Sequence, residues 1–105
     1  MNAEYLKQIV EAFRKLHHCG CEHESTVPVR EMFQGKVAWD GDVETMRLIG
    51  HLKADKGYAW GFKEPEGRWE ITTVLRIPPV TSPQTAVKIA LAAAAKDRAK
   101  IDRRI

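Results

Sequence analysis

The sequence contains few of the features that mark specialised protein classes. Its two cysteines are too few for the disulfide framework of a small secreted domain. No apolar run approaches the roughly 20 residues that a helix needs to cross a bilayer, and no repeat period indicates a solenoid or a coiled-coil array. These absences favour one globular α+β domain over residues 1–105, with no membrane partner.

Signatures of the common enzyme classes are also missing. The sequence has no Gly-x-Ser-x-Gly elbow, no phosphate-binding loop, no His-Glu-x-x-His zinc motif and no Gly-x-Gly-x-x-Gly dinucleotide motif. The sequence therefore favours a non-catalytic protein without a resident cofactor. One cluster of His and Cys residues, described below, is the exception that could hold zinc, copper or nickel.

The formal net charge of +3 comes entirely from the last ten residues, where five Lys and Arg side chains stand against Asp97 and Asp102. Such a basic segment is typical of a helix C-terminus, where cations complement the helix dipole. Cys19 and Cys21 flank a single glycine, so a disulfide between them would be strained. Free thiols indicate a reducing compartment, and we expect a cytoplasmic protein.

Hydrophobic periodicity predicts a helix at each end of the chain. Over residues 3–18 apolar residues recur every three or four positions, with Asn2 as the expected N-cap. Gly20 is the expected left-handed residue that ends this helix. A second helix is expected after Ser82-Pro83, because serine caps a helix and proline suits its first turn.

The segments between the helices predict three strands. Residues 21–35 carry a weak pattern interrupted by Pro28 and are interpreted as a connector. Residues 36–49 form either one strand bulged at Gly41 or a hairpin that turns at Asp40-Gly41, and the short arm of such a hairpin favours the bulged strand.

A second hairpin is expected from residues 58–63 and 68–77, joined by the four-residue loop Glu64-Pro65-Glu66-Gly67. This register pairs Lys63 with Arg68 and gathers the rings of the hairpin on one face of the sheet. Those rings belong to Tyr58, Trp60, Phe62 and Trp69.

One aromatic sheet face and two amphipathic helices predict a two-layer α+β sandwich of the order αβββα. In this prediction an antiparallel three-stranded sheet packs against both the N-terminal and the C-terminal helix. The rings of the hairpin form the core beneath them.

Several short segments resemble a group of small bacterial proteins of uncharacterised function. They are Val27-Pro28-Val29, Phe33-Gln34-Gly35, Gly50-His51, Tyr58-Ala59-Trp60 and Ile77–Pro83. The resemblance extends over the stretch from Val27 to Val87 and implies no particular activity.

The expected order of elements is also similar to that of double-stranded RNA-binding domains. That resemblance implies contacts from the first helix, from the loop between the first two strands and from lysines that open the last helix. His51, Lys53 and Lys56 lie in a loop that could make such contacts or bind another partner. The first lysine of the last helix is Lys88, too late for the pattern, and phosphate contacts supply most of the affinity. Nucleic acid is therefore disfavoured as a partner.

The most unusual segment is residues 17–23. It offers five imidazole or thiol groups, a ligand set that suits zinc, copper or nickel. A structural zinc site usually joins two separate segments, whereas these residues all lie in one stretch, so packing and helix-end electrostatics also explain them. The candidate ligands are His17, His18, Cys19, Cys21 and His23.

The aromatic residues offer a second candidate surface. A stripe of rings can line a ligand pocket or form a core, and Trp39 is the ring expected to escape the core because its strand is ambiguous. The two edges of a three-stranded sheet and the Ala-rich face of the last helix are further candidate surfaces, and they favour a small binding or assembly module. Its partner is an unidentified protein or a second copy of the chain, as in a homodimer. Metal binding and double-stranded RNA binding are the two alternatives.

Overall fold

The computed structural model describes residues 2–102. It contains two helices and four strands, so the α+β class is confirmed, whereas the prediction of three strands is wrong. None of the helices within the described residues has the length and apolar character needed to cross a membrane. The elements in chain order are α1 (Ala3–His17), β1 (Gly20–Phe33), β2 (Lys36–Ile49), β3 (Lys56–Lys63), β4 (Trp69–Leu75) and α2 (Pro83–Asp102).

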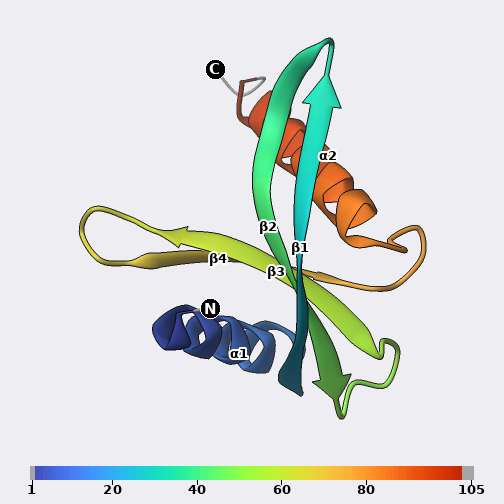
Figure 1. Ribbon diagram of the computed structural model, residues 1–105. Coiled ribbons are helices and arrows are strands. Elements are labelled where there is room, and N and C mark those ends of the chain that lie inside the picture. The colour runs from blue at the N-terminus through green and yellow to red at the C-terminus, as the bar shows by residue number, and fades with distance from the viewer. Residues whose placement is uncertain (1, 103–105) are drawn as a thin grey trace.

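The four strands form one antiparallel sheet in the order β1-β2-β3-β4. Figure 1 shows two long hairpins, β1–β2 and β3–β4, that cross near the middle of the molecule and point in different directions. They are joined only where Glu44–Arg47 of β2 pairs with Lys56–Ala59 of β3. Beyond this crossing, each hairpin extends as a separate arm.

The extra strand is β1, which occupies most of the segment predicted as a connector. It is an edge strand, so the missing N–H of Pro28 is tolerated there. A two-residue turn at Gln34-Gly35 joins β1 to β2, and both residues have positive φ (51° and 76°), as a type I′ turn requires. Glutamine is an unusual first residue for this turn, which explains why the sequence pattern did not reveal the hairpin.

The preference for a single strand over residues 36–49 is confirmed, because β2 spans that whole segment. The predicted bulge at Gly41 is wrong, since Gly41 pairs in register with Val29. The two irregularities of the β1–β2 ladder lie elsewhere, between His23 and Ser25 and between Glu31 and Met32.

The predicted register of the β3–β4 hairpin is also wrong, by one residue. Lys63 pairs with Trp69 rather than with Arg68, because the loop has three residues instead of four. The amide of Gly67 donates to the Glu64 carbonyl, and Gly67 itself has φ 94°, which matches a type I turn followed by a glycine bulge. Since side chains alternate along a strand, this shift moves Trp69 to the opposite face of the sheet.

The two helices cover opposite faces of the sheet, so the predicted two-layer arrangement is wrong as well. Ile9 and Phe13 of α1 pack with Met46, Leu48 and Ala59. A second cluster joins the first turns of α2 to the other face, through Val43, Tyr58, Val80, Ala86 and Val87. Tyr58 and Ala59 are adjacent in β3 and belong to different clusters, as expected for side chains on opposite faces.

The helix ends follow the sequence, with one correction. The Asn2 side chain accepts from the Glu4 amide at 2.8 Å, so the predicted cap of α1 is confirmed. The left-handed residue at its C-terminal end is His18 (φ 55°) rather than Gly20, which begins β1. Ser82 caps α2 by accepting from the Thr85 amide at 3.2 Å. The side chains of the basic C-terminal segment from residue 97 onward lie outside the described residues.

Candidate binding cleft

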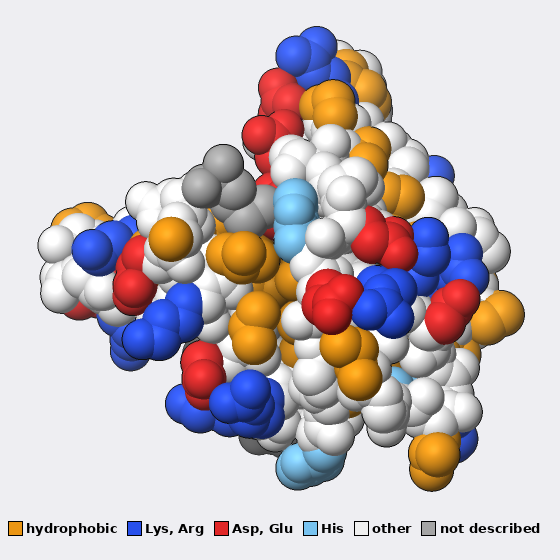
Figure 2. Space-filling view, turned by 60° about the horizontal axis from the view of Figure 1, so that its bottom comes forward, with side chains coloured by type: hydrophobic (Ala, Val, Ile, Leu, Met, Phe, Trp, Pro, Cys, Tyr) orange, Lys and Arg blue, Asp and Glu red, His pale blue; other side chains and the backbone are white. Residues whose placement is uncertain are grey.

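The divergence of the two hairpins opens a cleft between their arms. Residues 36–43 of β2 and 60–63 of β3 have no sheet partner on the sides that face away from β1 and β4. A cavity of about 360 Å³ lies between these free edges. Figure 2 shows the outline of the molecule with its two projecting ends. We call this cavity the arm cleft, and it is lined by Trp39, Asp40, Gly41, Asp42, Trp60, Gly61, Phe62, Glu70 and Thr72.

A second cavity, of about 520 Å³, continues from the arm cleft along α2. The two cavities share Trp39, Trp60 and Thr72, and the second is otherwise lined by Thr73 and Val74 of β4 and by apolar residues of α2, including Leu91 and Ala94. The alanines of this helix fill little space, so the helix leaves a hollow beside the sheet. A largely apolar surface therefore extends beyond the arm cleft.

Trp39 and Trp60 form the wall common to both cavities. Their ring centroids lie 5.7 Å apart in an edge-to-face arrangement, which is a favourable geometry for aromatic pairs. Both rings are only partly buried. Trp39, which the sequence singled out as a ligand residue, thus lies beside a cavity. Trp60, which was predicted to lie in the core, packs against Trp39 and lines the same cavity.

The predicted common face holds for the three rings of β3 and fails for Trp69. Tyr58, Trp60 and Phe62 alternate along β3 and share the α2 face, where Tyr58 is buried and Phe62 is 62% exposed at the arm cleft. Trp69 stacks on Tyr5 of α1 with a centroid distance of 5.6 Å, on the opposite face of the sheet.

Carboxylates surround the aromatic wall of the arm cleft. Asp40 pairs with Arg30, with 3.0 Å between the carboxylate oxygen and the guanidinium nitrogen. Glu70 pairs with Arg68 at 3.7 Å, and both ion pairs are exposed to solvent. Asp42 has no ion pair within residues 2–96. The sequence did not point to Asp42 and Glu70, because only the divergence of the hairpins brings them to one cavity.

A buried carboxylate lies on the α1 face, near the crossing of the hairpins. The side chain of Glu44 is 4% exposed, and its oxygen is 3.0 Å from His23 Nε2. It also accepts a hydrogen bond from the Thr26 hydroxyl. Burial, and then the nearby charges of Glu44 and Asp42, raise the pKa of Tyr5, whereas a hydrogen bond with the Gly61 backbone lowers it. A signal for Glu44 was available, since it occupies the same strand face as the apolar Met46 and Leu48.

The five candidate metal ligands do not converge on one point. His17 shares a hydrogen bond with Thr73 Oγ1 at 2.8 Å, whereas His23 contacts Glu44. His18 is exposed at the end of α1, and Cys19 is buried in the core under that helix. No group of three or more metal-binding side chains occurs among the residues that the structure describes.

Both cysteines are free and stay protonated at neutral pH. Burial, helped by the neighbouring Cys19, raises the pKa of Cys21 to about 11, although Arg14 acts in the opposite sense. Burial also raises the pKa of Cys19. A thiol is nucleophilic only as the thiolate, so neither cysteine is activated for catalysis.

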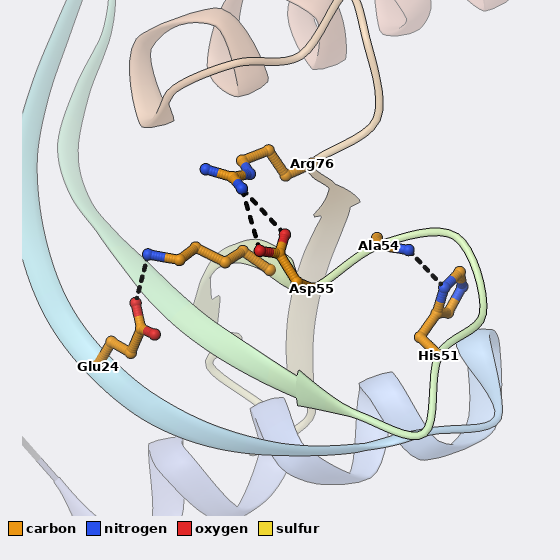
Figure 3. Close-up of polar contacts among 6 residues, drawn as sticks. Glu24, His51, Ala54, Asp55 and Arg76 are labelled. Atoms are coloured by element: carbon orange, nitrogen blue, oxygen red, sulfur yellow. Dashed lines mark hydrogen bonds and ion pairs between the residues drawn. The ribbon is translucent and has the colours of Figure 1, made fainter.

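The loop between β2 and β3 uses its polar residues internally. His51 Nδ1 accepts from the backbone amides of Lys53 and Ala54, at 3.0 and 3.1 Å. Lys56 forms an ion pair with Glu24 at 3.0 Å, and Asp55 next to it accepts from Arg76. Figure 3 shows how these contacts tie the loop to β1 and to the end of β4. His51, Lys53 and Lys56 were predicted as a partner surface. Within residues 2–96, Lys53 is the one of the three whose side chain forms no hydrogen bond or ion pair.

No protein-family model, curated protein or solved structure matches this chain.

Proposed function

We propose that this protein is a non-catalytic binding module that holds an extended segment of a partner protein in the arm cleft. The observation that carries this proposal is the pair of free strand edges beside two partly exposed tryptophans. A free edge presents unpaired N–H and C=O groups, and an extended peptide satisfies them by adding a strand. The tryptophan rings and the neighbouring apolar hollow along α2 supply surfaces for alternate side chains of that peptide.

The chemistry of the cleft favours binding over catalysis. Its described lining contains no Ser, Cys or His, and its acids are exposed and face solvent. The buried Glu44 and its partner His23 do not contribute to that lining. The residues of the cleft therefore suit recognition of side chains and backbone.

Selection of displayed random peptides against the full chain tests this function. Enriched peptides are expected to bind the wild type and to lose about 30-fold in affinity with the Trp39→Ala variant, the effect of removing a central aromatic contact. Leu52→Ala is the control, because Leu52 is a fully exposed apolar side chain outside the cleft. Enriched peptides that bind Trp39→Ala as tightly as wild type, or no enrichment at all, would contradict the proposal.

Self-association is a second candidate, favoured by the tip of the β1–β2 hairpin. Met32, Phe33 and Val37 are 50%, 67% and 51% exposed there, and contiguous exposed apolar residues mark interaction sites. Sedimentation velocity from micromolar to millimolar protein is expected to show a dimer that Phe33→Ser abolishes. A wild-type monomer throughout that range would exclude this candidate.

A further inference from the structure

We propose that the arm cleft recognises a cationic side chain, an Arg guanidinium or a Lys ammonium, carried by a basic extended segment of the partner protein. This inference rests on the proposed function and adds the chemistry of the ligand. Its basis is the combination of aromatic rings and carboxylates around one cavity.

The described lining of the arm cleft is acidic and aromatic at the same time. It contains three carboxylates and three aromatic rings, and it includes no Lys, Arg or His. Cations are attracted to the faces of aromatic rings, most strongly to tryptophan, and carboxylates add a direct charge interaction. A guanidinium fits both, because its plane stacks on a ring while its N–H groups donate to carboxylates.

This local acidity does not follow from the overall composition. Outside its last ten residues the chain is neutral overall, so an acidic cavity departs from the average of that part of the sequence. An acidic cleft attracts basic segments and disfavours acidic ones, and such complementarity selects partners and their orientation.

The carboxylates differ in how available they are. Asp40 and Glu70 are partly neutralised by Arg30 and Arg68, but those pairs are exposed, and exposed pairs exchange at little cost. Asp42 has no ion pair within residues 2–96. Within these residues, Asp42 is therefore the carboxylate of the lining whose charge no ion pair offsets.

The indole N–H signals of the isotope-labelled full chain provide the test, with n-butylguanidinium and n-butylammonium as probes and butyramide as the neutral control. The cations are expected to shift the Trp39 and Trp60 signals saturably. The Trp69 signal should stay in place, because that ring stacks on Tyr5 away from the cleft. Butyramide should leave all three signals unchanged.

Asp42→Asn is expected to weaken binding of the guanidinium about fivefold, as loss of a partly exposed ion pair predicts. Glu11→Gln, a carboxylate on α1 outside the cleft, should leave the affinity unchanged. Equal shifts with butyramide, shifts of Trp69 as large as those of Trp39, or no saturable shift would each overturn the inference. If neutral displayed peptides bind in a Trp39-dependent way, the binding function stands and only the cationic ligand is refuted. If cations shift both signals but no peptide depends on Trp39, the binding function fails instead.

Discussion

The two faces of the sheet are made by the same strands but differ in how completely their helices cover them. On the α1 face, Ile9, Phe13 and Met46 are fully shielded from solvent. On the α2 face, the residues with no exposed surface are Val43 of β2 and Ala86 and Val87 in the first turns of α2. Trp39 and Trp60 remain partly exposed there, next to two cavities.

The cause of this difference is the geometry of the crossing hairpins. α1 packs against β1 and β4, so it spans the region where the hairpins meet, whereas α2 packs mainly against β1 and β2 and reaches β3 through Tyr58 beside its first turns. One helix cannot cover two arms that point in different directions (Figure 1). The three largest fully buried side chains, Phe13, Ile9 and Met46, therefore lie on the α1 face, while the α2 face keeps partly exposed rings beside two cavities.

The largest expected effect is on the α1 face. The Phe13 ring lies so close over Gly57 that an added Cβ there would be 2.6 Å from the ring. Phe13→Ala should therefore lower the free energy of unfolding by about 3–5 kcal/mol, the loss of a fully buried ring plus the cavity left behind. Leu16→Ala, at a residue 61% exposed on the same helix, should cost under about 0.5 kcal/mol. Urea denaturation measures both, and similar costs would refute the view of α1 as the stabilising helix.

The closed character of the α1 face also predicts slow thiol chemistry. Since the pKa of Cys21 rises from 9.0 to about 11, the thiolate fraction at pH 8 falls about 100-fold on folding, and alkylation by iodoacetamide should slow accordingly. The folded state favours the neutral thiol, so its contribution to stability is lost as pH rises from 9 toward 11. Mass spectrometry of native and urea-unfolded protein measures the ratio. Equal alkylation rates would mean that this face is open.

Local signals predicted the helices, while the arrangement of the sheet escaped them. Asn2 and Ser82 mark the helix starts because capping depends on a few adjacent residues. The β3–β4 register depends on whether the loop has three or four residues, and the proline and glycine of Glu64-Pro65-Glu66-Gly67 are compatible with both. One residue in that loop decided which face Trp69 occupies.

The candidate site was predictable only in part, for a related reason. Trp39 was singled out from its ambiguous strand, and the structure places it beside a cavity. Asp42 and Glu70 could not be assigned to it, because they meet across two hairpins whose divergence has no local sequence signal. Conversely, His17 and His23 are near in sequence but contact different strands, since the helix ends between them.

A smaller effect is expected from the buried carboxylate of the α1 face. Glu44→Gln removes the charge that His23 and Thr26 contact, so it should cost about 1–3 kcal/mol, as for a buried hydrogen bond to a charged group. The matched control is Glu22→Gln on the same sheet, whose ion pair with Arg47 is exposed and should be worth under about 1 kcal/mol. A cost at Glu44 no larger than at Glu22 would show that solvent reaches this part of the α1 face.

The smallest expected effect is at the arm cleft, and it gives the comparison its sharpest form. Trp39→Ala removes an edge-to-face contact with Trp60 but leaves a surface that already faces a cavity. The cost should be about 1 kcal/mol, close to that of the aromatic pair alone. A tryptophan is larger than a phenylalanine, so a uniform core would lose more at Trp39 than at Phe13. If urea denaturation shows a larger loss of unfolding free energy for Trp39→Ala than for Phe13→Ala, the α2 face is a packed core that stabilises the fold. Trp39 would then not be free to bind a partner.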